Sequence, residues 1–218
     1  MPETDSSTLT KVSLREVVEE SYRALRSVGY SWGQAQSAGR VAGMAQVLFG
    51  SGVQAVITDS KRPFAAKRLP VASVGNSHGE IDARKTSFVT HGPMALAMAL
   101  SGSSTQVHIK RSRASQEIAA ALWDIEDVPA NQYFWGVTGD DPSGYSVRSG
   151  SLYRHGSPEK PGRVSWSITS SNFSGGDLIL SSEQRKTALE TALRSGVEVN
   201  GKTWAALKKI SWKFLVPE

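Results

Sequence analysis

The sequence predicts an α+β fold. Two helices open the chain, strands and helices alternate through its centre, a turn-rich region with strand-like runs follows, and two helices close it. A chain of 218 residues is long enough for one full hydrophobic core. We therefore expect residues 11–218 to form a single domain behind a disordered leader of residues 1–10.

The opening pair of helices is the most clearly specified part of the chain. Apolar residues recur at helical spacing over residues 14–28, and Ser13 with Glu16 has the pattern of a capping box. A second helix over residues 34–48 carries small residues along one face, namely Ala35, Ala38, Gly39, Ala42, Gly43 and Ala45. Because such a face lets another backbone come close, we expect it to support self-association and hence a homo-oligomer.

The next part of the chain is less regular. Residues 53–57 fit a short strand or a helical turn equally well. Residues 59–85 contain several Pro and Gly and little periodicity, which is typical of a long functional or mobile loop. A short strand is expected over residues 86–89. The apolar helix over residues 94–100 should then begin at Pro93, because proline suits the first helical position.

The remaining segments alternate between strand-like and helix-like patterns. They are a strand over 105–110, a helix over 115–125, an aromatic strand over 133–137, strand-type runs over 144–153 and 163–169, a short strand over 178–180, and helices over 182–195 and 202–216. Residues 155–162 are rich in turn formers, so the two long runs beside them are expected to pair as an antiparallel hairpin.

Composition excludes several classes of protein. There is no cysteine, so the chain has no disulfide, thiolate metal site or cysteine nucleophile. No apolar run reaches the roughly 18 residues that span a bilayer, and the polar start lacks a signal-peptide pattern. We expect a cytoplasmic protein of bacterial type. The net charge of +5 comes from short clusters on different elements, which favours small anions over nucleic acid as partners.

Two histidines are candidate acid/base groups. His78 lies in a polar loop with two carboxylates and Arg84 close in sequence, where a carboxylate can orient an imidazole. His91 lies at the mouth of the apolar helix, whose first N–H groups attract anions. An exposed loop histidine and a plain capping residue are the alternatives. The four histidines of the chain have neither i, i+4 pairing nor acids at metal spacing, so no metal site is expected, and His155 should be solvated.

A cluster of cations at a strand end is the candidate substrate site. It comprises Lys110, Arg111 and Arg113, together with His108 on the strand and Arg84 upstream. A guanidinium fork matches a carboxylate with two parallel hydrogen bonds, so we expect a small carboxylate ligand. We place His91 and Arg111 at opposite ends of one helix–strand unit, so that the ligand contacts only the arginines. A solvated strand end is the alternative.

Two segments resemble the type-2 malate/L-lactate dehydrogenases. They are Val12-Ser13-Leu14 with the Gly-x-Ser turn Gly29-Tyr30-Ser31 and the alanine-rich helix after it, and Thr90-His91-Gly92-Pro93-Met94 with Val107-His108-Ile109-Lys110. The chain as a whole is similar to an uncharacterised bacterial family of this length that shares Ser31-Trp32-Gly33 and a final helix with Trp204 and Leu207. The resemblance implies a cytosolic catabolic enzyme that acts on a small carboxylate metabolite.

The chain also departs from the dehydrogenase pattern. Those enzymes carry a Ser-His-Gly triplet after the second helix, where this chain has Ile57-Thr58-Asp59-Ser60, and Ser77-His78-Gly79 comes later. The chain is roughly a third shorter than an enzyme with a full nicotinamide-binding domain needs. The resemblance implies a nicotinamide cofactor, but no other feature supports one, and the cofactor is left unassigned. The alternative function is a non-catalytic subunit or binding module that self-associates through the N-terminal helices.

Overall fold

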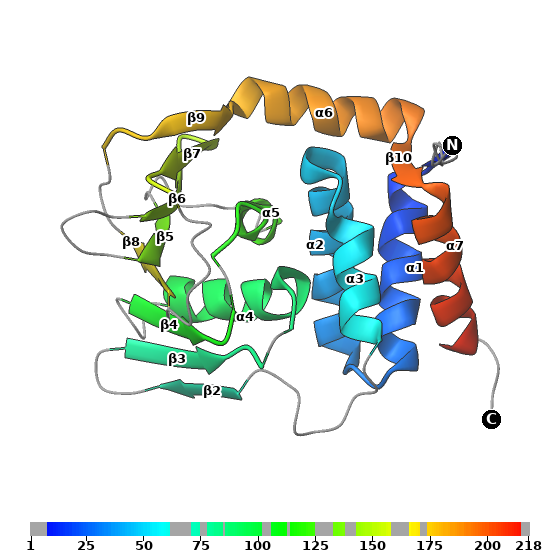
Figure 1. Ribbon diagram of the computed structural model, residues 1–218, viewed down its shortest axis with the longest axis horizontal. Helices are drawn as coiled ribbons and strands as arrows, with labels where there is room; N and C mark the ends of the chain where they lie inside the picture. Colours follow the sequence, from blue (N-terminus) through cyan, green and yellow to red (C-terminus); the bar gives the residue numbers. More distant parts are fainter. Residues whose placement is uncertain are drawn as a thin grey trace, which may run out of the picture. The chain divides into compact units, whose positions relative to one another are not determined.

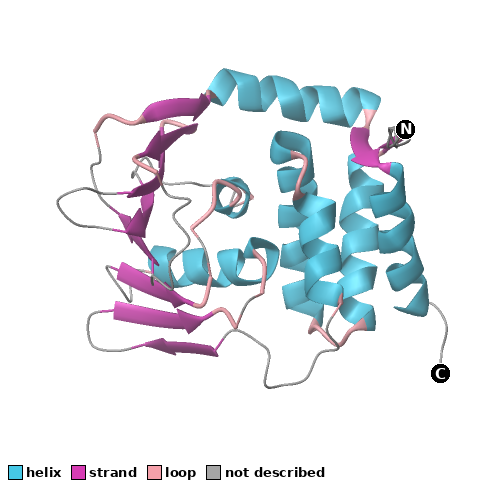
Figure 2. Cartoon of the chain, in the orientation of Figure 1, coloured by secondary structure: helices cyan, strands magenta, loops and turns pink. Residues whose placement is uncertain are grey.

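The computed structural model describes residues 8–61, 71–74, 78–84, 86–101, 106–112, 114–124, 133–137, 143–157, 166–170 and 174–214. Figures 1 and 2 show substantial helix and strand content, which confirms the α+β class. The chain forms two compact units. Unit 1 contains residues 1–63 and 188–218, and unit 2 contains residues 64–187. A single domain from residue 11 onward stays a prediction.

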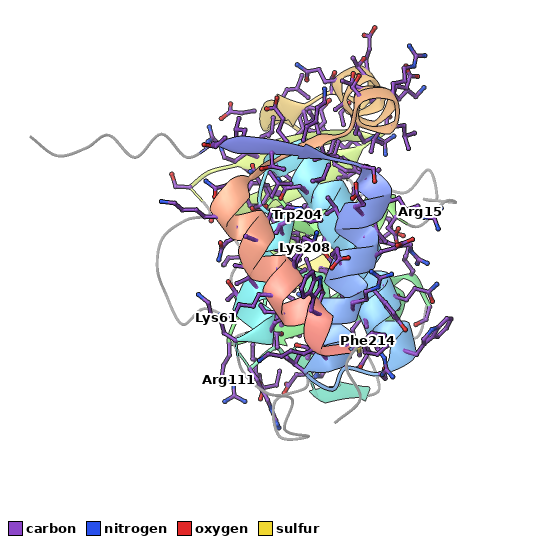
Figure 3. The ribbon with its side chains drawn as sticks, turned by 90° about the vertical axis from the view of Figure 1, so that its right-hand side faces the viewer. Arg15, Lys61, Arg111, Trp204, Lys208 and Phe214 are labelled. Carbon is purple, nitrogen blue, oxygen red and sulfur yellow. The ribbon has the colours of Figure 1, made fainter. Side chains whose placement is uncertain are left out.

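Unit 1 is mainly helical. Its helices are α1 (Leu14–Ser27), α2 (Trp32–Phe49), α3 (Gly52–Ser60) and α7 (Gly201–Ser211), followed by the 3-10 turn η2 (Trp212–Phe214). Both predicted helices at the start are confirmed, and Ser13 with Glu16 forms the expected capping box. Residues 53–57 belong to α3. Helix α7 runs beside α1, with Trp204 9% exposed and Phe214 edge-on to Tyr22 (Figure 3).

A two-stranded antiparallel sheet completes unit 1. Strand β1 (Leu9–Val12) pairs with β10 (Val197–Asn200), from Leu9 against Asn200 to Val12 against Val197. The assignment of residues 9 and 10 to a disordered leader is therefore wrong. Their hydrogen-bonding partner, β10, lies near the other end of the sequence, so no pattern within a few residues predicts strand β1. The buried Gln46 side chain donates to Glu198 O at 3.0 Å and accepts from Val53 N at 3.1 Å, which ties α2 to both β10 and α3.

The small-residue face of α2 packs within unit 1. A Cβ atom on Gly39 would lie 2.9 Å from Val18 O of α1, and one on Gly43 would lie 2.7 Å from Val18 Cγ2. A Cβ on Gly52 of α3 would lie 1.9 Å from Ala42 O. Because this face is occupied by α1 and α3 of the same chain, the reason given for self-association through it is wrong. Oligomerisation itself stays a prediction.

Unit 2 is built on an eight-stranded sheet of order β2-β3-β4-β8-β5-β6-β7-β9. The strands are β2 (Val71–Val74), β3 (His78–Asp82), β4 (Gln106–Lys110), β5 (Tyr133–Val137), β6 (Ser143–Arg148), β7 (Ser151–His155), β8 (Trp166–Ser170) and β9 (Asp177–Leu180). Strands β3 and β4 are parallel, and the other neighbours are antiparallel. Helices α4 (Phe88–Leu100) and α5 (Ile118–Trp123) pack against each other, and α6 (Ser182–Ser195) runs on into unit 1.

The core of unit 2 lies between the sheet and α4. Ile81, Val107, Ile109 and Ile168 are fully buried and share one sheet face, because successive side chains of a strand alternate. Helix α4 contacts β3, β4 and β8 (Figure 1). The alternate residues of β3 and β4 are polar and partly exposed, so the opposite face of this part of the sheet is polar. Among the described residues, no helix is long and apolar enough to cross a bilayer.

Two expectations for the region before β4 are wrong. His78 is the first residue of β3, in a region expected to be a loop. Residues 88 and 89 belong to α4, which begins five residues before Pro93, so the predicted strand over 86–89 does not form. Burial of Val89 and Leu96 on one side of α4 stabilises this longer helix although Pro93 cannot donate a backbone hydrogen bond.

The predicted pairing of the strand-type runs is also wrong. Ser149 and Gly150 have φ of 47° and 76°, and they connect β6 to β7 as a tight hairpin inside the first run. Two consecutive residues at positive φ are the requirement of a type I′ turn, so this dipeptide was the signal for the hairpin. Strand β8, from the second run, pairs with β4 and β5.

Two glycines of α2 provide a matched test of the packing in unit 1. Gly33 has open space around its missing Cβ, whereas Gly39 faces Val18 O. Gly33→Ala should stabilise the protein by up to about 1 kcal/mol through helix propensity. Gly39→Ala should destabilise it by about 1–3 kcal/mol, because α1 must move away. Urea unfolding of both variants measures the difference, and equal effects would contradict the packing described.

Candidate functional site

The polar groups gather where the parallel strands β3 and β4 end. Asp82, the last residue of β3, is the cross-strand partner of Lys110, the last residue of β4. Beyond each strand the chain turns through an arginine in the left-handed region, with φ of 48° at Arg84 and 57° at Arg111. Such φ values are uncommon for residues with a side chain and occur where neighbouring interactions fix the backbone.

Asp82 binds both arginines. Arg111 Nε donates to Asp82 Oδ1 at 2.6 Å, and its Nη2 donates to Oδ2. The backbone N–H of Arg84 donates to Oδ1 at 3.1 Å, and Arg84 Nε lies 3.7 Å from Oδ2. The hydrogen bond from Arg111 is the largest cause that holds the pKa of Asp82 below its usual value. Two guanidinium groups therefore face one carboxylate, and we call Asp82, Arg84 and Arg111 the cationic edge.

His91 contacts the residue that follows Arg111 of the cationic edge. It is 1% exposed in the first turns of α4, and its Nε2 lies 2.9 Å from Oγ of Ser112, the residue after Arg111. The expectation that His91 and Arg111 lie at opposite ends of one unit is therefore wrong. A helix and the strand that follows it after a short connection run in opposite directions, which brings the helix start to the strand end.

The environment of His91 favours its neutral form. Burial lowers the pKa of His91 to about 4, and hydrogen bonding with the backbone of Thr86 and Ser87 opposes part of that shift. A neutral imidazole has one ring nitrogen that can accept a proton and one that carries a proton, and the tautomer decides which of them faces Ser112. His91 and Ser112 thus form a hydrogen-bonded imidazole–hydroxyl pair beside the cationic edge.

The other predicted histidines meet on the polar face of the sheet. The rings of His78 and His108 are 5.7 Å apart and edge-on, although they come from different strands. Glu80 of β3 is the cross-strand partner of His108, and its carboxylate pairs with Lys110 Nζ at 2.8 Å. The predicted catalytic His78 and the predicted binding residue His108 are therefore neighbours on the polar face.

Some residues of the site were missed, and others lie elsewhere than expected. The sequence analysis did not name Asp82 or Ser112 as site residues. Asp82 could have been found as an acidic residue two positions before Arg84, whereas no sequence pattern marks Ser112. Arg113 lies outside the described residues. His155 is 8% exposed, so the expectation that it is solvated is wrong; it ends β7 and lies 2.8 Å from Ser146 Oγ.

Solved structures of several dehydrogenases share this fold over nearly the whole chain. Malate dehydrogenase from Entamoeba histolytica aligns with a TM-score of 0.64 and 11% identity, covering 97% of this chain and 99% of that one. Malate dehydrogenase from Pyrococcus horikoshii aligns at 0.61 and 10%, covering 100% and 99%. Sulfolactate dehydrogenase from Methanocaldococcus jannaschii aligns at 0.59 and 8%, covering 95% and 98%.

The chain has the fold of these dehydrogenases. This confirms the coarse part of the resemblance drawn from the sequence, and identities of 8–11% extend it to the fold alone. No protein-family model matches the chain, and no curated protein matches it by sequence. Membership of the uncharacterised bacterial family stays a prediction.

The buried His91 makes stability depend on pH. Its folded pKa of about 4 lies below the unfolded value of 6.5, so the unfolded state binds more protons between these pH values and stability falls as pH decreases. Between pH 7 and pH 5 the loss from His91 should be about 2 kcal/mol. Urea unfolding at several pH values measures it, and His91→Gln should remove most of that slope.

Burial also lowers the pKa of His155, so part of the slope that remains in His91→Gln is assigned to that residue. Carboxylates such as Asp82 add their own loss of stability only at lower pH, near and below about pH 4. An NMR titration of the His91 ring that gave a midpoint above pH 6 would contradict the assignment without any variant.

Proposed function

We propose that the chain is a dehydrogenase-like protein that binds a small carboxylate metabolite at the cationic edge. The observation that carries the proposal is the guanidinium of Arg111, which Asp82 holds through Nε and Nη2 and whose side chain is 57% exposed. A ligand carboxylate can accept hydrogen bonds from the other N–H groups of this guanidinium. The shared fold of the malate and sulfolactate dehydrogenases, whose names refer to small carboxylic acids, supports the same class of ligand.

Arg111 is the group proposed to contact the ligand carboxylate. Asp82 engages Nε and Nη2 of Arg111, and among the described residues no partner contacts its Nη1 group. The side chain is 57% exposed, so a ligand oxygen can reach this donor from solvent. Asp82 then has a positioning role, because it fixes the plane of the guanidinium and so the direction of the remaining N–H bonds.

Ser112 and His91 are the groups proposed to handle a proton. A ligand hydroxyl next to its carboxylate would lie near Ser112 Oγ, which is itself hydrogen-bonded to His91. His91 is neutral at pH 7 and can accept a proton relayed through that hydroxyl. Oxidation of a 2-hydroxy acid releases one proton and one hydride. A nicotinamide cofactor, which the family resemblance implies, would accept the hydride, and no group of described residues marks where it lies.

A ligand screen tests the binding proposal. L-lactate, L-malate and sulfolactate at millimolar concentration should each be tested by thermal shift, because a ligand that binds the native state stabilises it by mass action. At a concentration about 100 times Kd the gain is about 2.7 kcal/mol, or several degrees for a chain of this size. Arg111→Gln should abolish the shift and leave the melting temperature without ligand within a few degrees, because an exposed ion pair contributes roughly 0–1 kcal/mol.

Arg15→Gln is the matched control for this variant. Arg15, near the start of α1, also pairs with a carboxylate through its Nε, at 2.7 Å from Glu19, and is exposed (Figure 3). It should retain the full ligand shift. Binding that persists in Arg111→Gln would contradict the site and direct attention to His78 and His108. The absence of a shift with every carboxylate would contradict the proposed function.

The same preparation separates an enzyme from a binding module. Pyruvate or oxaloacetate with NADH or NADPH should be followed by the loss of absorbance of the reduced cofactor. Turnover that is lost in Ser112→Ala, with the ligand shift retained, supports the proton route. A carboxylate shift without turnover supports the non-catalytic alternative, which the missing Ser-His-Gly triplet at residues 57–60 favours.

A further inference from the structure

A separate hollow lies at the other end of the eight-stranded sheet. Its volume is about 610 Å³, within the range of about 300–1,000 Å³ that is usual for small-molecule sites. It is lined by residues of β6, β7 and β9, of the turn before α5 and of the segment after β7, namely Gln116, Tyr145, Arg154, Gly156, Ser157, Asp177 and Ile179. Strands β8 and β5 separate it from β3 and β4 in the sheet order.

One cross-strand row of the sheet builds the hollow. Trp135 pairs with Tyr145, Tyr145 with Arg154, and Arg154 with Asp177. Exposure rises along this row, from 0% at Trp135 and 5% at Tyr145 to 51% and 79% for the side chains of Arg154 and Asp177. The buried aromatic residues Trp135 and Tyr145 are therefore followed along the row by the exposed ion pair of Arg154 and Asp177.

Tyr145, the aromatic residue that lines the hollow, is held in place by Trp135. The Tyr145 ring stacks on the Trp135 ring with centroids 6.1 Å apart and planes at 28°. The Trp135 indole N–H donates to Ser115 O at 2.8 Å, which fixes the chain next to Gln116 at the rim of the hollow. Tyr145 and Ile179 thus offer apolar surface, and Gln116 and Ser157 offer hydrogen-bonding groups.

The charges of the hollow select the ligand. Arg154 Nη2 and Asp177 Oδ2 lie 3.2 Å apart, and they are the charged groups among the lining residues that the structure describes. This ion pair attracts neither a simple anion nor a simple cation, since one of the two groups repels it. A ligand with both charges at similar spacing can pair each with its opposite. The amino nitrogen and the carboxylate oxygens of an α-amino acid are about 3 Å apart, as their bond lengths dictate.

We infer that this hollow is a binding site for a zwitterionic α-amino acid. The ligand carboxylate accepts hydrogen bonds from Arg154, the ammonium group donates to Asp177, and an apolar or aromatic side chain lies against Tyr145 and Ile179. The site is distinct from the cationic edge, where Arg111 is proposed to bind a carboxylate. It would give the chain a binding site for a second small ligand.

Calorimetric titration with three matched compounds tests the inference. L-phenylalanine carries both charges, 3-phenylpropanoate lacks the ammonium group and phenethylamine lacks the carboxylate. L-phenylalanine should bind at millimolar concentration or below, and each analogue should bind at least roughly tenfold more weakly. A tenfold loss corresponds to about 1.4 kcal/mol, a modest requirement for one lost charge pair.

Substitutions in the ion pair give the sharper result. Arg154→Gln and Asp177→Asn should each weaken L-phenylalanine binding at least roughly tenfold. Asp177→Asn should also strengthen binding of 3-phenylpropanoate relative to the wild-type protein, because the group that repels the anion is removed. Arg111→Gln and Arg15→Gln, which change the cationic edge and an unrelated ion pair, should leave L-phenylalanine binding unchanged. Failure here and failure of the carboxylate site are therefore distinguishable.

Several outcomes would overturn the inference. These are equal binding of L-phenylalanine and 3-phenylpropanoate to the wild-type protein, retained binding in folded Arg154→Gln, and no heat of binding with either L-phenylalanine or L-leucine. Circular dichroism melts confirm that each variant is folded. If a variant does not fold, the comparison of the three compounds on the wild-type protein still decides.

Discussion

The hydrogen-bond register of the eight-stranded sheet is the constraint on which the chemistry of unit 2 depends. Because side chains alternate along a strand, the pairing of β3 with β4 puts Ile81 and Ile109 in the core and leaves Glu80 and His108 on the polar face. A slip of one residue would exchange these faces and bury charge. The register across β5, β6, β7 and β9 likewise places the aromatic pair Trp135 and Tyr145 beside the ion pair of Arg154 and Asp177. The two ends of the sheet therefore differ in chemistry.

Local chemistry decides how much of the fold can be predicted from the sequence. The capping box at Ser13 and the apolar periodicity of the first helix are encoded within a few residues, and both predictions hold. Strands β4 and β5 and helix α6 were also predicted from their own residues. The partners of β1 and β8 lie far away in sequence, so neither pairing has a local signal. Pro93 led to a wrong prediction because proline favours the first position of a helix. Burial of α4 on both sides of Pro93 stabilises a helix that begins five residues earlier.

The candidate site shows the same division. The sequence predicted the cluster of cations at the end of β4. It also predicted that His108 points away from the core side chains Val107 and Ile109. The binding of Arg111 by Asp82 was not, because it depends on two parallel strands ending at the same level. The contact of His91 with Ser112 depends on the antiparallel course of α4 and β4. In both cases the partner residue is ordinary by type and acquires its role from topology.

Unit 1 is assembled from both parts of the chain that flank unit 2, and this has a consequence for biosynthesis. Helices α1, α2 and α3 leave the ribosome early, but α7 and β10, the strand partner of β1, follow only after all of unit 2. The face of α1 that receives α7 must therefore wait while unit 2 is made, and it exposes apolar surface during that time. Unit 2 is one continuous segment, whereas unit 1 cannot be completed until residues 188–218 have been made.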